Sequence, residues 1–439
     1  VAGGNCGTIT LGSTTQLNFT VTATTYAGGI AGSNNARGST RGLITGGVPM
    51  AQVTAATYAG GAAGINYADI RNVNNQAPVR ANDTLAGGIA GTNAAGAAIR
   101  NAEITAGATV TAANGAAGGF VSENSGLIEN GTVRGGTINF TSGTIGAVAT
   151  YNRKGGIIRG TAVAQDAKVH LNGPATIVGG IAGRNNGTIS ASYVATDANG
   201  KSIIAARYGF VGGVAGSNSG SITNSGSQQA QALVSKVNNE WLPLNTDDAN
   251  TGINAMVAEL TKTNGTYTGF KGVDTVGAHD YGYGSVYLTE NKTTTSGGRW
   301  GTTTTTKAGL AANDLTVVLR GNNNVDNNDS QRGSGYLGGI TGYNSVTGAI
   351  TDSATGRWFV YGDNISKAST IGGIVGTNIS SKDLTTLVNC AAVRRYTRLS
   401  SKKNDDNTTN EHTSAKATRI EVHAVSYTHL RAHETLSDL

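Results

Sequence analysis

An asparagine that recurs about every 30 residues constrains the possible fold of this chain more than any other feature. The residue six positions before it is glycine in all nine copies, and the residue four positions before it is always apolar. Glycine also lies five positions before it in eight copies, with Ala147 as the exception, and two positions before it in seven. A fixed period of this length is typical of stacked structural repeats. The nine asparagines are Asn34, Asn66, Asn93, Asn124, Asn152, Asn185, Asn218, Asn344 and Asn378.

The pattern before each asparagine has the period of a β-strand, because residues two apart point to the same face. A helix would scatter these positions around its surface. Glycine at fixed places indicates either a positive φ or the close approach of another layer of backbone. The asparagine that closes the strand can adopt the left-handed conformation, and its side chain can bond the equivalent asparagine of the next copy. We therefore expect a ladder of stacked asparagines.

A second apolar position follows four residues after the asparagine, as at Ile128, Ile189 and Ile222, and a variable strand such as residues 137–140 comes later. Three short strands per copy predict one coil of a parallel β-helix, with neighbouring coils ~4.8 Å apart. The expected fold is all-β, a right-handed parallel β-solenoid with coils of about 30 residues. Residues such as Ile181, at the position that is apolar in every copy, should point into its core.

The repeats divide the chain into four parts. Residues 1–225 and 335–393 carry the solenoid repeats, and residues 226–334 interrupt them as an inserted module. Apolar side chains at helical spacing within residues 253–260 predict that this insertion has mixed structure. Residues 394–439 are polar and charged, which predicts a disordered C-terminal tail.

Both ends of the sequence have unusual features. The last fifteen residues, 425–439, resemble the peptide produced by translating a sequencing-library adapter, so we expect this segment to be an artefact outside the fold. At the other end the chain begins with Val1, in the middle of a repeat. These features predict a fragment from an environmental or gut sequence assembly, which belongs to a longer protein anchored through regions missing here.

Two segments carry the repeat in its fullest form. They are GGIAGRNNGTISASYVAT, residues 179–196, and residues 212–225. Both resemble the GLUG repeat, a family found in bacterial adhesins, in large surface proteins of gut and oral bacteria, and beside the catalytic domain of immunoglobulin-A-cleaving metallopeptidases. The resemblance covers most of both repeat regions. It implies display on the cell surface or secretion, and it transfers no catalytic residue.

Little in the sequence points to catalysis, a cofactor or nucleic acid. The net charge is +6, but no basic stripe with interleaved aromatics is visible, so no nucleic-acid partner is expected. The repeated Gly-Gly-x-x-Gly lacks the strand-to-helix unit of a dinucleotide loop, and there is no HExxH metallopeptidase signature. No run of 18 apolar residues exists, so no transmembrane helix is expected. We expect no catalytic, cofactor-binding or metal-binding residue.

The two cysteines and one segment rich in asparagine and aspartate carry no clear metal or disulfide pattern. Cys6 and Cys390 lie at opposite ends of the chain, and each is expected to be a small buried apolar side chain rather than part of a disulfide framework. Residues 322–330 alternate oxygen ligands that could hold calcium. They lack the central glycine and the final glutamate of an EF-hand, which favours a polar loop.

The favoured function is a non-catalytic structural or adhesive segment of a large bacterial cell-surface or secreted protein that binds host protein or glycan. One alternative is a carbohydrate-active β-helix enzyme, which needs carboxylates or basic residues clustered on one sheet face, whereas the recognisable strand positions are glycine, alanine and aliphatic. A second is a non-catalytic solenoid beside a metallopeptidase domain. An ice-binding solenoid needs threonine at one outward position in every coil, which the strand before the asparagine lacks.

The insertion is the expected site of partner binding, because inserts on a solenoid commonly carry its function. Its aromatic residues are of the types that anchor proteins or stack on sugars, although they can equally form a small core of the insert itself. The candidate ligand-binding residues are Trp241, Tyr281, Tyr283 and Trp300.

Overall fold

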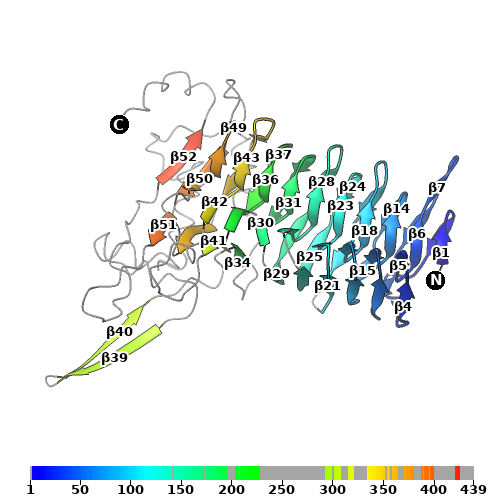
Figure 1. Cartoon of the computed structure of the whole chain (residues 1–439), viewed down its shortest axis with the longest axis horizontal. Coiled ribbons are helices and arrows are strands. Elements are labelled where there is room, and N and C mark those ends of the chain that lie inside the picture. The colour runs from blue at the N-terminus through cyan, green and yellow to red at the C-terminus, as the bar shows by residue number, and fades with distance from the viewer. Residues whose placement is uncertain are drawn as a thin grey trace.

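The computed structural model shows an all-β chain whose short parallel strands stack into a long solenoid (Figure 1). No helix occurs among the described residues. The parallel β-solenoid predicted from the repeat is therefore confirmed. The described residues are 2–105, 107–140, 143–172, 175–194, 203–206, 208–227, 292–298, 301–307, 315–320, 334–351, 353–355, 358–363, 370–372, 374–379, 387–388, 390–394, 396–399 and 421–425.

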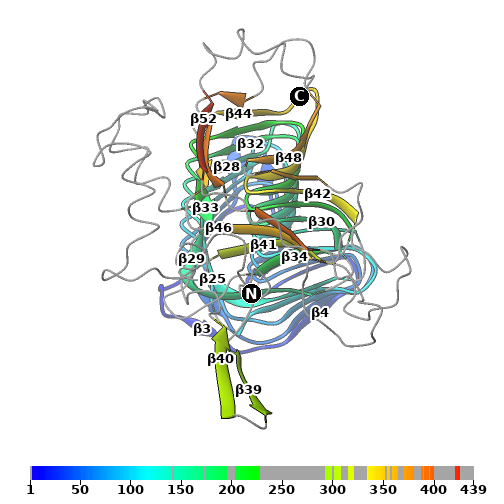
Figure 2. The same ribbon diagram turned by 90° about the vertical axis from the view of Figure 1, so that its left-hand side faces the viewer.

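Each coil passes through four sheets, which we call the glycine, asparagine, isoleucine and variable sheets (Figure 2). One coil runs through β12 (Tyr58–Gly60), β13 (Ala63–Asn66), β14 (Asp69–Arg71) and β16 (Val79–Ala81). The sequence predicted three strands per coil. The structure has four because the segment that ends at the asparagine bends in its middle, so its two halves join different sheets.

The strands of the first two sheets lie in register from coil to coil. The glycine sheet contains β5 (Tyr26–Gly28), β12, β17 (Leu85–Gly87), β22 (Ala116–Gly118), β26 (Gly143–Gly146), β30 (Ala175–Gly179), β35 (Tyr208–Gly212), β42 (Ser334–Gly338) and β47 (Thr370–Gly372). The asparagine sheet contains β1 (Ala2–Asn5), β6 (Ala31–Asn34), β13, β18 (Ala90–Asn93), β23 (Val121–Asn124), β27 (Ala149–Asn152), β31 (Ala182–Asn185), β36 (Ala215–Asn218), β43 (Thr341–Asn344) and β48 (Val375–Asn378).

The other two main sheets complete each coil. The isoleucine sheet contains β2 (Thr8–Thr10), β9 (Leu43–Thr45), β14, β19 (Ala98–Arg100), β24 (Leu127–Glu129), β28 (Ile157–Arg159), β32 (Thr188–Ser190), β37 (Ser221–Thr223), β44 (Ala349–Thr351) and β49 (Leu387–Val388). The variable sheet contains β4 (Val21–Ala23), β11 (Val53–Ala55), β15 (Asn74–Asn75), β16, β20 (Glu103–Ile104), β21 (Thr109–Ala112), β25 (Thr132–Phe140), β29 (Ala162–Asn172), β33 (Tyr193–Val194), β38 (Gly226–Ser227), β45 (Ala354–Thr355), β50 (Cys390–Arg394) and β52 (Glu421–Val425).

The remaining strands form small sheets. A parallel four-stranded sheet contains β34 (Ile203–Ala206), β41 (Leu315–Arg320), β46 (Trp358–Asp363) and β51 (Tyr396–Leu399). The three remaining pairs are β3 (Gln16–Leu17) with β10 (Val48–Pro49), β7 (Ala36–Arg37) with β8 (Thr40–Arg41), and β39 (Lys292–Gly298) with β40 (Gly301–Lys307). The hairpin of β39 and β40 points away from the stack in both views (Figures 1 and 2).

The asparagines form one continuous ladder. Each side-chain amide Nδ2 donates to the Oδ1 of the equivalent asparagine in the next coil, at 2.7–2.8 Å. All nine asparagines aligned from the sequence lie in it, and Asn5 is a tenth member. The side chains are buried from Asn5 to Asn344, and Asn378 at the far end is exposed. The ladder satisfies polar groups that would otherwise be buried without partners.

The residues with a left-handed backbone conformation are not the ladder asparagines. None of the ten ladder asparagines has a positive φ, because each stays in an extended strand that pairs with the next coil. The left-handed residues lie at the corner after the isoleucine sheet, where the chain must turn sharply. Asparagine tolerates this conformation better than most residues. They include Asn72 (φ 55°), Asn101 (51°), Asn130 (51°), Ala191 (46°) and Asn224 (49°).

A second, shorter ladder of hydroxyls follows this corner. The Ser192 Oγ accepts a hydrogen bond from the Thr161 backbone N–H at 3.2 Å and donates to the Ser190 carbonyl at 2.9 Å. In the next coil the Ser225 Oγ accepts from the Ser192 backbone N–H and donates to the Thr223 carbonyl. The Ser353 Oγ likewise accepts from the Ser225 backbone N–H and donates to the Thr351 carbonyl. These hydroxyls hold the turns of the C-terminal half of the stack.

The repeated glycines mark places where backbone layers approach closely. A Cβ on Gly60 would lie 1.9 Å from the Ala63 carbonyl oxygen, and one on Gly61 would lie 2.4 Å from Cγ of Asn75. Neither glycine has a positive φ. Of the two explanations that the sequence allowed, close approach is therefore the one that applies. The bend between the first two sheets leaves no room for a side chain.

The core consists of aliphatic columns that run along the stack. Ile181, expected to point inward, is fully buried, and Ile128, Ile189 and Ile222 are fully buried as well. Among the described residues, the largest fully buried side chain is Phe120, which occupies the position of Ile181 in an earlier coil. A Cβ on Gly131 would lie 2.8 Å from the ring of Phe120, so the small residue makes room for the large one.

The interruption of the repeats does not interrupt the stack. β36 and β43 pair in register and Asn218 bonds Asn344, although 126 residues separate these two asparagines. Within the range expected for the insert, β41 is hydrogen-bonded between β34 and β46. Within the range expected for the tail, β51 pairs with β46 and β52 pairs antiparallel with β50. Residues 253–260, with their helical spacing, lie outside the described residues.

Replacing Ile181 by Asp should lower the free energy of unfolding by about 3–5 kcal/mol, because the carboxylate would be buried without a partner. Ile157→Asp is the matched control, since Ile157 is 39% exposed and its substitution should cost far less. Denaturant unfolding followed by circular dichroism measures both. Equal costs for the two variants would contradict the burial of Ile181.

Replacing Asn185 by Leu should interrupt the ladder, because Nδ2 of Asn152 and Oδ1 of Asn218 would both lose a partner in a buried setting. Each lost side-chain hydrogen bond should cost about 0.5–1.5 kcal/mol, because both atoms keep longer hydrogen bonds of 3.3–3.4 Å to backbone groups. The exposed neighbour Asn186 provides the control, and Asn186→Leu should leave the unfolding curve nearly unchanged. A similar small effect at both positions would show that the ladder contributes little to stability.

Candidate binding surface

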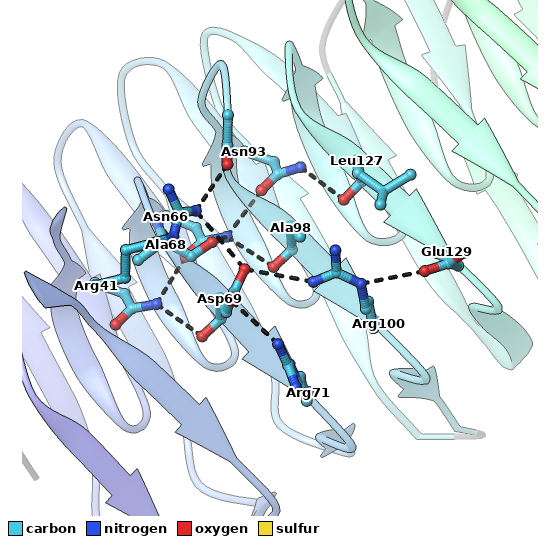
Figure 3. Close-up of polar contacts among 12 residues, drawn as sticks. Arg41, Asn66, Ala68, Asp69, Arg71, Asn93, Ala98, Arg100, Leu127 and Glu129 are labelled. Atoms are coloured by element: carbon cyan, nitrogen blue, oxygen red, sulfur yellow. Dashed lines mark hydrogen bonds and ion pairs between the residues drawn. The ribbon is translucent and has the colours of Figure 1, made fainter. Parts of the chain in front are cut away.

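The outer face of the isoleucine sheet carries a row of charged residues. Arg71, Arg100, Glu129 and Arg159 are register partners on four successive strands, each following the buried isoleucine of its strand. Asp69 lies beside this row and forms ion pairs with three arginines (Figure 3). The distances from its carboxylate are 3.7 Å to Arg41, 3.2 Å to Arg71 and 3.4 Å to Arg100.

Glu129 continues the row towards the next coil. Its Oε2 accepts a hydrogen bond from Nε of Arg100 at 3.1 Å, and its Oε1 pairs with Arg159 (Figure 3 shows the contact with Arg100). The hydrogen bond from Arg159 is the largest influence on the carboxyl group and lowers its pKa below the usual value, and Arg100 acts in the same direction. Glu129 is therefore held ionised between two cations from neighbouring coils.

A shallow cavity of about 450 Å³ lies next to the charged row. Its apolar side is formed by Ala98, Leu127 and Ile157, which occupy the other outward position of the isoleucine sheet. Its charged side is formed by Arg41, Asp69 and Arg100. Arg41 is anchored at the rim, because its Nη2 donates to the Gly96 carbonyl oxygen at 2.7 Å.

A second cavity, of about 290 Å³, lies on the asparagine sheet. The outward position just before the ladder asparagine is Glu123, Tyr151 and Arg184 on three successive coils. The guanidinium of Arg153 lies 4.5 Å from the centre of the Tyr151 ring and pairs with Glu123. Such a cation over a ring is attracted by the ring electrons.

Aromatic side chains stack at two places where the glycine and asparagine sheets meet. Tyr26 and Tyr58 have ring centres 5.2 Å apart, and partial burial, followed by the charges of these two tyrosines, raises the pKa of Tyr67. Tyr26 is 40% exposed and Tyr67 is 43% exposed. A second cluster joins Phe210, Tyr336 and Tyr343, with ring centres 4.8–6.2 Å apart. The solenoid itself thus displays aromatic side chains.

The binding residues predicted from sequence lie elsewhere in the chain. The four candidates Trp241, Tyr281, Tyr283 and Trp300 are outside the described residues. The same holds for residues 322–330, whose alternating oxygen ligands could hold calcium. Within the described ranges, no group of three or more His, Cys, Asp or Glu side chains is placed to hold a metal ion. Across the same ranges, no apolar helix reaches membrane-spanning length.

The expectation for Cys6 is wrong. Its side chain is exposed and free, because the position just after a ladder asparagine faces outward, as the exposed Tyr67, Arg153 and Asn186 at equivalent positions show. Cys390 lies in β50, and its side chain is outside the described set.

Sequence reasoning did not single out Tyr151, Arg153 or Arg184. One signal could have found the first and the last, because the residue just before each ladder asparagine is outward and variable. A charged or aromatic residue at that position lies on the surface and is not needed for the packing of the coils.

In comparisons with protein-family models, curated proteins and solved structures, nothing matches this chain.

The ion pairs of Glu129 should make stability depend on pH. Because its folded pKa is depressed, the contribution is present above the unfolded value of about 4.5 and is lost as the pH falls through the folded value. The difference in melting temperature between the wild type and Glu129→Gln should therefore shrink as the pH falls below about 4.5. It should also shrink in high salt, which screens exposed pairs.

Asp83→Asn is the control for this measurement, because Asp83 is an exposed carboxylate elsewhere on the surface. Its melting temperature should differ little from that of the wild type across the same pH range. A difference for Glu129→Gln that stays constant from pH 7 to pH 3 would show that the two arginines do not depress the pKa.

Proposed function

We propose that this chain is a non-catalytic structural and adhesive segment of a bacterial cell-surface or secreted protein that binds host protein or glycan. The observation that carries the proposal is the arrangement of outward side chains in register columns, one residue per coil. Columns of this kind place charged and aromatic groups ~4.8 Å apart along a rigid stack. The resemblance to GLUG repeats supports an extracellular or cell-surface location.

The separation of inward and outward positions suits a display scaffold. The ladder and the aliphatic columns hold the fold from within, so outward residues can vary without disturbing it. Solenoids use such continuous surfaces for binding extended partners. The charged row, the two aromatic clusters and the two cavities described above are all built on outward positions or on the turns beside them.

The chemistry of the charged row supports binding rather than glycan cleavage at this face. A glycosidase needs one carboxyl group whose raised pKa keeps it protonated. Glu129 has the opposite property, because Arg159 and Arg100 lower its pKa. Asp69 is held by three arginines. Both carboxylates are therefore suited to fixing the arginines in place.

A glycan and host-protein array probed with the labelled full chain tests the proposal. We expect retention of a defined subset of glycans or host proteins, with binding that saturates. Incubation of the same glycans with the chain should release no shorter product. Absence of binding to every array member, or release of cleaved glycan, would refute the adhesive, non-catalytic role.

A variant series on the same array locates the contacts. One variant replaces Trp241, Tyr281, Tyr283 and Trp300 together by Ala, and a second replaces Tyr26 and Tyr67 by Ser. Loss of binding in the first variant alone places the partner on the insertion. Loss in the second alone places the partner on the exposed aromatic residues of the solenoid. If both variants keep binding, the charged faces of the solenoid are the remaining candidates.

A further inference from the structure

Three successive coils of the asparagine sheet bring one acidic, one aromatic and one basic side chain side by side. Glu123, Tyr151 and Arg184 are register partners on β23, β27 and β31, at the outward position just before the ladder asparagine. Because the neighbouring ladder residues are hydrogen-bonded to one another, the spacing of these three side chains is set by the fold.

Arg153 already has two partners within this group. It forms an ion pair with Glu123, and its guanidinium lies 4.5 Å from the centre of the Tyr151 ring. The ion pair and the ring contact together restrain the arginine and the tyrosine. Both side chains are therefore oriented before any ligand arrives, which reduces the entropy lost on binding.

Arg184 differs from Arg153, because no carboxylate of the described residues pairs with it. Its register partner in the following coil is Ser217, which is uncharged. The pairing of Glu123 with Arg153 therefore leaves Arg184 without a carboxylate partner among the described residues.

These side chains border the cavity of about 290 Å³, which is lined by Tyr151, Asn152, Arg153, Arg184 and Asn186. The amide of Asn152 is used by the ladder. Asn186 is exposed, and its side-chain amide has no hydrogen-bond partner within the described part of the chain. The cavity thus offers one unpaired guanidinium, one unpaired amide and one aromatic ring.

We propose that this cavity binds a single ring of an acidic sugar. Arg184 pairs with the sugar carboxylate, because a guanidinium matches a carboxylate in charge and in geometry. The Asn186 amide exchanges hydrogen bonds with ring hydroxyls, since it carries both donors and an acceptor. Tyr151 contributes its apolar surface to the carbon side of the ring. A bare inorganic anion would use the guanidinium and leave the amide and the ring without a role.

The size of the cavity agrees with this ligand. Small-molecule sites commonly measure about 300–1,000 Å³, so a cavity of 290 Å³ is suited to one ring rather than to an extended chain. The inference rests on the proposed function, because it names the chemical class that one face of the solenoid would recognise. The contacts expected elsewhere on the surface do not depend on it.

The test titrates the full chain with glucuronic acid, N-acetylneuraminic acid, glucose and sodium sulfate by calorimetry or NMR. At least one of the two acidic sugars should bind, and should bind more tightly than glucose or sulfate. Arg184→Gln should weaken that binding by tenfold or more, and Asn186→Ala by about threefold. Arg80→Gln is the matched control, because it removes the same charge from an exposed position on the variable sheet and should change the Kd by less than twofold.

Each other outcome overturns the inference. Equal binding of glucose would show that charge plays no part, and equal binding of sulfate would show a site for bare anions. An unchanged Kd in Arg184→Gln, with a melting curve like that of the wild type, would place the acidic sugar elsewhere. If Arg184→Gln does not fold, an unchanged Kd in Asn186→Ala contradicts the site in the same way.

The array separates this inference from the proposed function. If the wild type and Arg184→Gln retain the same array members and neither binds an acidic monosaccharide, the site is refuted and the adhesive role stands. If the wild type binds no array member but binds an acidic sugar through Arg184, the site stands and the adhesive role is refuted.

Discussion

The hydrogen bond between asparagine side chains of neighbouring coils sets the register on which the rest of the solenoid depends. Each amide is both donor and acceptor, so every asparagine inside the ladder holds the coil before it and the coil after it. An aliphatic side chain has neither a donor nor an acceptor and could not take this place. Chains of such bonds also polarise and strengthen one another in a buried setting. Coils of 27 to 34 residues therefore stack in one alignment despite their unequal lengths.

This alignment determines what the surface can carry. Outward side chains of adjacent coils lie ~4.8 Å apart, a distance at which like charges repel appreciably. Arg71 and Arg100 are such neighbours, and Asp69 lies between their guanidinium groups and binds both. Glu129 separates Arg100 from Arg159 in the same way. The columns thus balance their own charge along most of the row, and positions such as Arg184, which lacks a described acidic partner, differ from that pattern.

Much of the fold could be predicted from sequence, because the repeat records interactions that recur in every coil. The asparagine ladder and the burial of Ile181 followed from invariant positions. The bend at glycines such as Gly60 and Gly61 was not predicted, since the glycine pattern does not distinguish close approach within one strand from a turn between two. The left-handed residues were assigned to the wrong asparagines. The residues that are left-handed, such as Asn72 and Asn101, come just after the isoleucine-sheet strand of their coil. In other coils this position holds Ala191 or a glycine, so asparagine does not recur there regularly enough to be recognised in the sequence.

The candidate sites could be predicted less well, for a physical reason. An outward residue is not needed for the packing of its own stack, so Tyr151 and Arg184 interrupt a column instead of repeating along it. A search for recurring residues passes over such positions. The aromatic candidates of residues 226–334 belong to the segment that lacks the repeat, and they lie outside the described residues.

The pairing of β36 with β43 shows that adjacent coils of the stack can come from parts of the chain that lie far apart in sequence. The cost of closing a flexible loop grows only with the logarithm of its length, by about 0.6 kcal/mol for each doubling. By this relation, bringing Asn218 and Asn344 together from the unfolded chain costs only about 1.2 kcal/mol more than closing one ordinary coil, because 126 residues are about two doublings of that length. A few inter-coil hydrogen bonds can offset a term of that size. Lengthening a single turn is therefore an inexpensive way for such a solenoid to acquire new chain without altering its core.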